Sequence, residues 1–366
     1  MKILTIIGAR PQFIKAAPFS ALFREENEEI LVHTGQHYDA NMSNVFFDEL
    51  GIPIPNYYLG VGSGSHGLQT GRMLEKIEEI IKIEKPDGTL VYGDTNSTLA
   101  GALASSKLHI PVFHVEAGLR SYNKAMPEEQ NRILTDHISK LLLCPTANAV
   151  ENLKQEGIIS DVFNTGDIMY DAVLRNIDMS INQYSNGIWL SEIHGENGMI
   201  PKLQENEYYL ATIHRAENTD DCEKLAYIFA ALREMDKPVI MPLHPRTRKM
   251  IEMQKITTHN VIIIEPVGYL LMLYLTAHAY MVLTDSGGLQ KEAYFLKTPC
   301  VTLRNQTEWV ETLENDWNVL SSIDSESILT AASRKLDCMN YTQPMLFGDG
   351  YAADRIYQAI VNGRIT

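Results

Sequence analysis

Short apolar runs alternate with longer amphipathic stretches along this chain, and this alternation limits its possible folds more than any other feature. The runs are rich in Val, Ile, Leu and Tyr, and in the first half we expect strands at 2–7, 29–33, 89–92, 112–115, 141–144 and 162–164. Helical spacing lies between them at 13–24, 67–83, 98–107 and 129–139. The pattern predicts repeated βα units, that is, an α/β fold built on parallel sheets.

A second series of such units follows a polar, glycine-containing segment at 186–206. Its expected strands lie at 208–213, 239–242, 261–265, 280–283 and 300–303. Because 366 residues exceed what one core usually supports, we expect two domains, 1–168 and 169–349. The last stretch, 350–366, has apolar residues at helical spacing and is expected to pack back onto the first domain.

Composition narrows the class of function. The formal charge of −15 argues against broad binding to nucleic acid or to a membrane surface. The four cysteines have neither metal-ligand nor disulfide-framework spacing, so we interpret them as reduced thiols. The apolar run at 1–7 is too short for a signal peptide, and no later stretch has the length of a membrane span. The expected location is the cytoplasm.

Charged residues stand where several predicted strands end. Asp94 and Glu116 follow strands of the first series, and His214 with Arg215 follows the first strand of the second series. Ligands of open parallel sheets bind outside the carboxyl ends of strands, so these side chains are expected to face a common cleft. Glu128 follows Pro127 at a predicted helix start. Three carboxylates brought together there would suit general acid–base chemistry, although Asp94 and Glu128 could each simply favour a helix N-terminus.

Two further segments have the character of anion sites. Ser286, Gly287 and Gly288 lie between a predicted strand and a helix, where free amides can bind phosphate. Glu292, one turn later, could accept hydrogen bonds from a ribose diol. Taken alone, Ser286 is better explained as an N-cap. Arg10 and Lys15 lie beside the start of the first predicted helix, where they would attract an anionic substrate or remain solvated. His244 ends another predicted strand.

In this order, these segments resemble the non-hydrolysing UDP-N-acetylglucosamine 2-epimerases. The resemblance covers nearly the whole chain and rests on Gly8-Ala9-Arg10-Pro11, Gly93-Asp94-Thr95, His114-Val115-Glu116-Ala117-Gly118-Leu119-Arg120, Pro127-Glu128-Glu129, His214-Arg215, Asp285-Ser286-Gly287-Gly288 with Glu292, and Arg304 before Thr307-Glu308. It implies a GT-B architecture with two Rossmann-like domains facing a central cleft, UDP held mainly by residues 169–349, and a homodimer.

The resemblance also implies the reaction, which inverts C2 of the sugar without a metal or cofactor. A base removes the C2 proton while UDP leaves C1, and the resulting 2-acetamidoglucal is reprotonated on the other face as UDP adds back. Matched positions imply catalytic roles for Asp94, Glu116, Glu128 and His214. The implied substrate contacts are Arg10, Lys15, Arg215, His244, Ser286, Gly287, Gly288, Glu292 and Arg304. The product would be a precursor of surface polysaccharide.

Three alternatives stay open at this point. Departures from the family pattern, at Ala216-Glu217 and at Trp309-Val310-Glu311, are compatible with a modified substrate such as UDP-2,3-diacetamido-glucuronic acid. A hydrolysing relative would instead release free N-acetylmannosamine and UDP. A sensor that only binds a nucleotide sugar would not need Asp94, Glu116 and Glu128, so their joint presence favours an enzyme.

Overall fold

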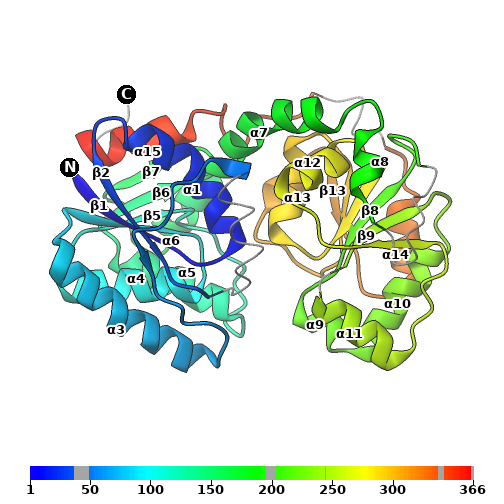
Figure 1. Cartoon of the computed structure of the whole chain (residues 1–366), viewed down its shortest axis with the longest axis horizontal. Helices are drawn as coiled ribbons and strands as arrows, with labels where there is room; N and C mark the ends of the chain where they lie inside the picture. Colours follow the sequence, from blue (N-terminus) through cyan, green and yellow to red (C-terminus); the bar gives the residue numbers. More distant parts are fainter. Residues whose placement is uncertain (37–48, 195–202, 244, 337–341, 364–366) are drawn as a thin grey trace. The chain divides into compact units, whose positions relative to one another are not determined.

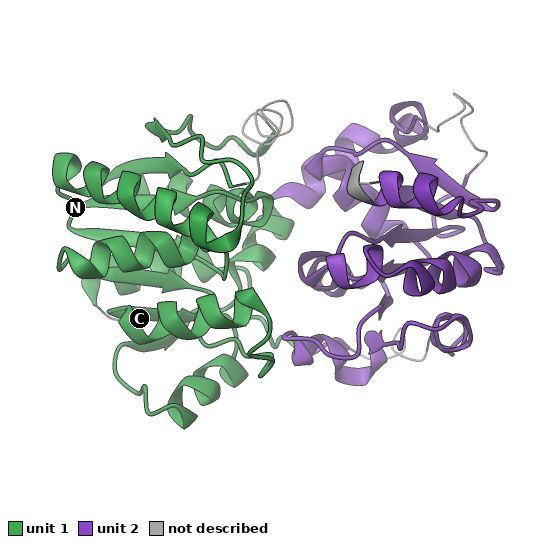
Figure 2. Ribbon diagram, turned by 90° about the horizontal axis from the view of Figure 1, so that it is seen from below, with its two compact units in different colours: residues 1–175, 345–366 green, residues 176–344 purple. Residues whose placement is uncertain are grey.

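The chain divides into two compact units in its computed structural model, which describes residues 1–36, 49–194, 203–243, 245–336 and 342–363. Unit 1 comprises Met1–Arg175 and Met345–Thr366, and unit 2 comprises Asn176–Pro344 (Figure 2). Helix α7 (Ile168–Tyr184) begins in unit 1 and ends in unit 2. The C-terminal helix belongs to unit 1, although the whole of unit 2 separates it from the rest of that unit in sequence.

Unit 1 contains a parallel sheet of seven described strands in the order β3-β2-β1-β4-β5-β6-β7. Its elements are β1 (Lys2–Ile7), α1 (Arg10–Phe23), β2 (Glu28–His33), β3 (Tyr57–Tyr58), α3 (His66–Glu84), β4 (Gly88–Tyr92), α4 (Asn96–Lys107), β5 (Val112–Val115), α5 (Pro127–Ile138), β6 (Leu141–Cys144), α6 (Ala147–Gln155), β7 (Val162–Asn164) and α15 (Ala352–Asn362). The order reverses direction between β1 and β4, which makes the carboxyl ends of these two strands the expected ligand position.

Helices cover both faces of this sheet. Helices α3, α4 and α5 pack side by side on one face, and α15 packs against α1 on the other (Figure 1). The first core cluster contains Ile6 and Val91 from the strands and Met73 and Ile77 from α3. This core holds β1 and β4 beside each other at the point of reversal.

Unit 2 repeats the design with six described strands in the order β10-β9-β8-β11-β12-β13, all parallel. Its elements are α8 (Ile188–Glu192), β8 (Tyr209–Thr212), α9 (Ala216–Thr219), α10 (Cys222–Arg233), β9 (Val239–Pro242), α11 (Pro245–Gln254), β10 (Val261–Ile264), α12 (Tyr269–Ala277), β11 (Met281–Thr284), α13 (Gly287–Phe295), β12 (Cys300–Thr302), the 3-10 helix η1 (Val310–Asp316), β13 (Asn318–Leu320) and α14 (Ser325–Ala332). Here the order reverses between β8 and β11.

The predicted α/β class with parallel sheets is confirmed, and every predicted strand is present with similar limits. Two strands were missed, β3 and β13. They have two and three residues. Helix α8 lies in a segment that we expected to be a polar connection. It is held in place by Trp189, which is buried against Tyr208 with ring centroids 5.6 Å apart.

Candidate active site

The predicted residues of unit 1 gather at the carboxyl edge of its sheet, around the reversal of strand order. Asp94 lies two residues after β4, and Glu116 directly follows the neighbouring strand β5. Arg10 begins helix α1 just after β1, and Lys15 lies in the same helix. This edge therefore brings two carboxylates and two cations to the place where doubly wound sheets bind their ligands.

Glu116 is held in an unusual backbone conformation with a buried cationic partner. Its φ of 69° lies in the left-handed region, and its carboxylate Oε2 forms an ion pair with Lys15 Nζ. Both side chains are buried. A Cβ at Gly93 would lie 3.1 Å from Glu116 Oε2 and 3.6 Å from Lys15 Nζ. Gly93 also has a positive φ, 63°, so a side chain there would be both strained and crowded.

Asp94 is fixed by helix α5. Its carboxylate Oδ2 lies 2.5 Å from an Arg132 guanidinium nitrogen, and its carbonyl accepts a 2.8 Å hydrogen bond from Asn131. Arg132 is buried and also pairs with Glu129 at 2.9 Å. Pro127 starts the helix, so that Glu128 occupies its half-buried first turn. The same helix thus positions Glu128 and orients Asp94.

These pairings change the expected electrostatics of the site. We expected crowded carboxylates, whereas the structure gives Asp94 and Glu116 one cationic partner each. Thr95, not Asp94, is the N-cap of α4, because the Thr95 side chain accepts a hydrogen bond from the Thr98 backbone N–H; Asp94 lies just before this helix start, as its alternative explanation expects. Glu128 does lie in a first helical turn, as its alternative explanation expects.

Gln12 connects the turn after β1 to the end of β4 through side-chain hydrogen bonds. Its side-chain oxygen accepts hydrogen bonds from the Gly8 and Ala9 backbone N–H groups at 2.8 and 3.1 Å. Its amide donates 2.8 Å to the Tyr92 carbonyl. The Gly8 position has no room for a side chain, since a Cβ would lie 2.0 Å from Thr34 Oγ1. A buried glutamine therefore stabilises the turn that leads to Arg10.

The predicted residues of unit 2 that the structure describes occupy the corresponding edge of the second sheet, after β8, β11 and β12. Asp285 is fully buried and accepts hydrogen bonds from the backbone N–H groups of His214 at 3.2 Å and Arg215 at 3.0 Å. The Asn218 side chain donates a third bond at 3.1 Å. The His214 side chain stays 45% exposed, with Nδ1 3.4 Å from Asp285 Oδ1. Asp285 thus fixes the His214 backbone while the ring remains accessible.

The Ser286–Gly288 turn opens helix α13. Ser286 Oγ accepts a 3.3 Å hydrogen bond from the Leu289 N–H, so the N-cap interpretation is confirmed. A Cβ at Gly287 would lie 2.8 Å from Glu308 Oε1. Amides in a first helical turn lack intrahelical acceptors and carry the positive end of the dipole. The turn therefore retains its predicted ability to bind an anion, and Glu292 follows on the same helix as a buried carboxylate.

Glu308 lies close to both arginines that were predicted to contact the substrate in this unit. Arg304 NH1 lies 3.0 Å from Glu308 Oε2, and Arg215 NH2 lies 3.9 Å from Glu308 Oε1. Arg304 and Glu308 are buried. The remaining predicted substrate contact, His244, lies outside the described residues. Cationic groups therefore surround the α13 turn, but their pairing through Glu308 could not be foreseen from sequence.

Local sequence signals could have found some of the missed residues. Arg132 lies three residues after Glu129 in one helix, at a spacing that favours ion pairs. Gln12 occupies the third position of α1, where a glutamine commonly bonds back to the N-cap. Asp285 and Glu308 were part of the resemblance, yet only the structure shows what they bond.

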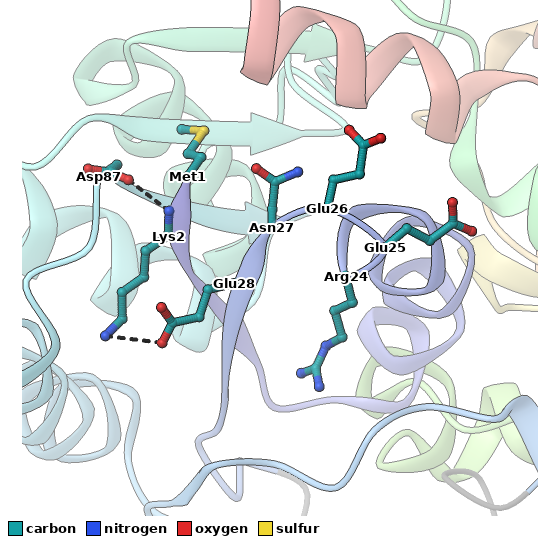
Figure 3. Close-up of a pocket in the computed structure, with 8 residues that line it drawn as sticks. All are labelled: Met1, Lys2, Arg24, Glu25, Glu26, Asn27, Glu28 and Asp87. Atoms are coloured by element: carbon teal, nitrogen blue, oxygen red, sulfur yellow. Dashed lines mark hydrogen bonds and ion pairs between the residues drawn. The ribbon is translucent and has the colours of Figure 1, made fainter.

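A separate hollow of about 670 Å³ opens at the amino ends of β1 and β2, away from the candidate residues (Figure 3). Among its lining residues, Lys2 Nζ lies 3.3 Å from Glu28 Oε1, and the Lys2 backbone N–H donates to Asp87 at 2.7 Å. Within the described residues, no cluster of three or more His, Cys, Asp and Glu side chains could hold a metal ion. No helix in the same residues combines the length and apolarity needed to cross a membrane.

Known proteins resemble this chain over its whole length. The sequence model of the UDP-N-acetylglucosamine 2-epimerase family matches residues 20–361. A UDP-N-acetylglucosamine 2-epimerase homolog from Methanococcus maripaludis is 54% identical, covering 99% of this chain and 100% of its own. The UDP-2,3-diacetamido-2,3-dideoxy-D-glucuronate 2-epimerase of Pseudomonas aeruginosa is 50% identical, covering 97% and 98%.

Solved structures of UDP-GlcNAc 2-epimerases also match this chain. The Methanocaldococcus jannaschii UDP-GlcNAc 2-epimerase, in complex with UDP-GlcNAc and UDP, matches with a TM-score of 0.89 at 41% identity, covering 99% of this chain and 100% of its own. The Neisseria meningitidis UDP-GlcNAc 2-epimerase bound to UDP-GlcNAc matches with a TM-score of 0.85 at 30% identity, covering 99% and 100%. These matches confirm the GT-B class that the sequence predicts.

Proposed function

Since this chain belongs to the UDP-N-acetylglucosamine 2-epimerase family, we propose that it interconverts UDP-N-acetylglucosamine and UDP-N-acetylmannosamine by inverting C2 of the sugar. One observation carries the proposal. Asp94 and Glu116 follow the neighbouring strands β4 and β5 of the first sheet, and each is paired with a cation. Carboxylates oriented side by side at the edge of the sheet are suited to general acid–base chemistry.

In the proposed reaction, a base removes the C2 proton and the C2–H electron pair forms the C1–C2 double bond. The C1–O bond breaks with its electron pair leaving on UDP, which gives a 2-acetamidoglucal. A proton then returns to the opposite face of C2 as UDP adds back to C1. We assign the proton donors and acceptors to Asp94, Glu116, Glu128 and the exposed ring of His214. Arg10 and Lys15 would bind the substrate on the unit 1 side.

Unit 2 would hold the leaving nucleotide. The amides of the Ser286–Gly288 turn and the dipole of α13 favour a diphosphate, and Arg215 and Arg304 add positive charge. Glu292 would accept hydrogen bonds from the ribose diol, and His244 is proposed to line the nucleotide pocket. Stabilising UDP as it departs lowers the barrier to elimination, because negative charge develops on the diphosphate.

A second substrate is favoured by one relative. The Pseudomonas aeruginosa protein named for UDP-2,3-diacetamido-2,3-dideoxy-D-glucuronate is 50% identical to this chain. That value exceeds the 42% of the Methanocaldococcus jannaschii UDP-N-acetylglucosamine 2-epimerase. The diacetamido sugar is therefore the second candidate, with the same C2 chemistry. Either product could serve as a polysaccharide precursor.

The test is proton NMR of the enzyme with each sugar nucleotide in deuterium oxide. Deuterium should enter C2 as the manno epimer accumulates. Release of free N-acetylmannosamine with equal UDP would replace the proposal with a hydrolysing reaction. If neither sugar nucleotide exchanges its C2 proton, the protein is not a 2-epimerase of these substrates, and UDP binding without exchange would identify a sensor.

We also propose that the enzyme is a homodimer, as its family resemblance implies. Light scattering should then give twice the chain mass of 41.2 kDa. A mass of one chain at micromolar concentration would contradict this assembly.

A further inference from the structure

A buried histidine–aspartate pair bonds both turns that carry the proposed catalytic carboxylates. His114 lies in β5 and Asp136 in α5, and both side chains are inaccessible to solvent. His114 Nδ1 lies 2.7 Å from Asp136 Oδ1, and Nε2 lies 2.8 Å from the Gly93 carbonyl oxygen. Gly93 immediately precedes Asp94, and His114 is two residues before Glu116. Neither residue can touch substrate, so any role must act through these turns.

Hydrogen-bond chemistry determines how many protons the His114 ring carries. A carbonyl oxygen only accepts hydrogen bonds, so Nε2 must carry a hydrogen. An ionised carboxylate also only accepts, so Nδ1 must carry one as well. A neutral ring would direct one nitrogen lone pair at an oxygen lone pair at 2.7 or 2.8 Å. The geometry therefore favours a doubly protonated imidazolium.

The other contacts of Asp136 show that its carboxylate is ionised. Asp136 Oδ2 accepts a 2.7 Å bond from Arg120 and a 3.1 Å bond from the Gly118 backbone N–H. The Arg120 guanidinium and the Gly118 N–H both stabilise the negative charge of this carboxylate. The proton of the pair therefore belongs on the ring.

The charges of the residues around His114 agree with a protonated ring. Arg120 pairs with both Asp136 and Glu156, at 2.7 and 2.6 Å, so two carboxylates face one guanidinium. Burial and the nearby Asp136 charge raise the pKa of the Cys144 thiol well above its usual value, which keeps it neutral. His137 lies 3.2 Å from Glu156 and is half exposed. If His114 is positive, the two cations His114 and Arg120 match the two carboxylates of buried Asp136 and exposed Glu156.

The pair bonds two turns that need left-handed backbone. Gly93 has a φ of 63° and Gly118 a φ of 81°. His114 bonds the Gly93 carbonyl, and Asp136 bonds the Gly118 N–H. A Cβ at Gly118 would lie 2.3 Å from the Ala149 carbonyl oxygen, so this turn has no room for a side chain at Gly118. Asp94 follows the first turn, and Glu116 begins the second.

We propose that His114 is a positioning residue held as an imidazolium between Asp136 and the Gly93 carbonyl, and that this ion pair sets the geometry of Asp94 and Glu116. The expected effect on catalysis rests on the proposed function, whereas the protonation state of His114 does not. The pair should affect the rate of C2 proton transfer and leave nucleotide binding by unit 2 unchanged.

The protonation state is tested first, on the wild-type enzyme labelled with nitrogen-15 histidine. Long-range proton–nitrogen correlation at pH 7.5, assigned through the backbone resonances, should show two protonated nitrogens for His114. A single unprotonated, pyridine-type nitrogen in that ring would overturn the imidazolium assignment. This result does not depend on knowing the substrate.

The positioning role is tested with Asp136→Asn, which keeps the size of the side chain but removes its charge. The new amide can donate to Nδ1, so His114 should become neutral with a pyridine-type Nδ1. We expect kcat to fall about 10²-fold, the effect of a small misplacement of catalytic groups, with KM and UDP affinity unchanged. The matched control is Asp161→Asn, which alters an exposed ion pair with Lys140 and should leave kcat unchanged.

The outcomes separate this inference from the proposed function. Wild-type kcat in a folded Asp136→Asn variant would overturn the positioning role. If that variant does not fold, His114→Gln provides the second kinetic test, because its amide can still donate to Gly93 but cannot carry the charge, and retention of wild-type kcat would also overturn the role. Absence of turnover in the wild type would reject the proposed function, while the nitrogen-15 spectrum would still decide the protonation state.

Discussion

At the scale of single residues, the candidate site combines strained backbone with buried charge. A non-glycine residue in the left-handed region costs about 1–2 kcal/mol, and Glu116 adopts that conformation with a φ of 69°. Its carboxylate thereby reaches Lys15. Such strain persists where surrounding contacts overdetermine it, and it is concentrated at functional sites. The conformation of Glu116 therefore agrees with its proposed role in proton transfer.

Glu116→Gln should reduce turnover with little change in nucleotide binding. The amide cannot accept the C2 proton, so we expect kcat to fall by about 10²–10⁴-fold. UDP affinity should persist, because the proposed nucleotide contacts belong to unit 2. The measurements are deuterium exchange at C2 and calorimetric titration with UDP. Glu151→Gln, which changes an exposed carboxylate of α6, is the control, and unchanged turnover in Glu116→Gln would refute the assignment.

Gly287→Ala should weaken UDP binding. The new Cβ would meet Glu308 Oε1 at 2.8 Å, so Glu308 must move and disturb its ion pair with Arg304. A loss of about 1.4 kcal/mol corresponds to a tenfold higher Kd, which titration calorimetry resolves. In Gly71→Ala, the Cβ meets nothing within 4 Å on α3. That control should retain UDP affinity, and an equal affinity in both variants would contradict the steric argument.

At the scale of secondary-structure elements, helix starts carry much of the site. Pro127 begins α5, which places Glu128 in its first turn and directs Arg132 at Asp94. Ser286 begins α13 and leaves the Gly287 and Gly288 amides at the positive end of its dipole. Helix α7 instead has a structural role, because its Asp171 accepts a 2.7 Å hydrogen bond from the Ala353 N–H and so attaches α15 to unit 1.

This attachment should depend on pH. Burial raises the pKa of Asp171 to about 6 from its usual 3.8, against hydrogen bonds from Ala353 and Ala352 that lower it. The folded chain therefore binds more protons than the unfolded chain between these values, and ionisation destabilises it as pH rises through about 6. Relative to wild type, Asp171→Asn should gain up to about 3 kcal/mol of unfolding free energy between pH 4 and pH 8.

Urea denaturation at several pH values measures this difference. Asp178→Asn, which changes an exposed residue of the same helix, should show little pH dependence relative to wild type. A constant difference between Asp171→Asn and wild type from pH 4 to pH 8 would show that Asp171 titrates normally in the folded chain.

At the scale of the whole molecule, the two units are variations of one design. Each has a doubly wound parallel sheet whose strand order reverses once, and each places candidate residues at the carboxyl edge of its sheet, beside that reversal. Unit 1 presents carboxylates paired with cations, whereas unit 2 presents a helix N-terminus with arginines. The division suggests proton transfer by unit 1 and nucleotide binding by unit 2.

Hydrogen–deuterium exchange should distinguish nucleotide binding by unit 2 from sugar binding by unit 1. With UDP alone, protection should concentrate in unit 2, at 212–218, 284–292 and 303–308, because these segments carry the proposed contacts. The complete sugar nucleotide should additionally protect unit 1 at 93–96 and 115–118. Protection by UDP that appears first in the unit 1 segments would contradict the assignment of nucleotide binding to unit 2.

Much of this organisation was predictable from sequence, since it depends on local patterns. The predicted strand before Asp94 and the one before Glu116 are β4 and β5, and the predicted turn at Ser286 is the start of α13. Strands β3 and β13, of two and three residues, were missed. The partners of the charged residues were missed because no local pattern specifies them.

The sequence by itself determined the α/β class, the strand positions and the types of residue at the strand ends, because apolar period and turn chemistry act over a few neighbouring residues. Only the tertiary structure decided which charges neutralise one another. Lys15 and Glu116 are 101 residues apart, and Asp94 and Arg132 are 38 apart. Such pairs meet only after β1, β4 and β5 assemble in one sheet with α1 and α5 packed on it, since burial makes each charge depend on a partner that the fold supplies.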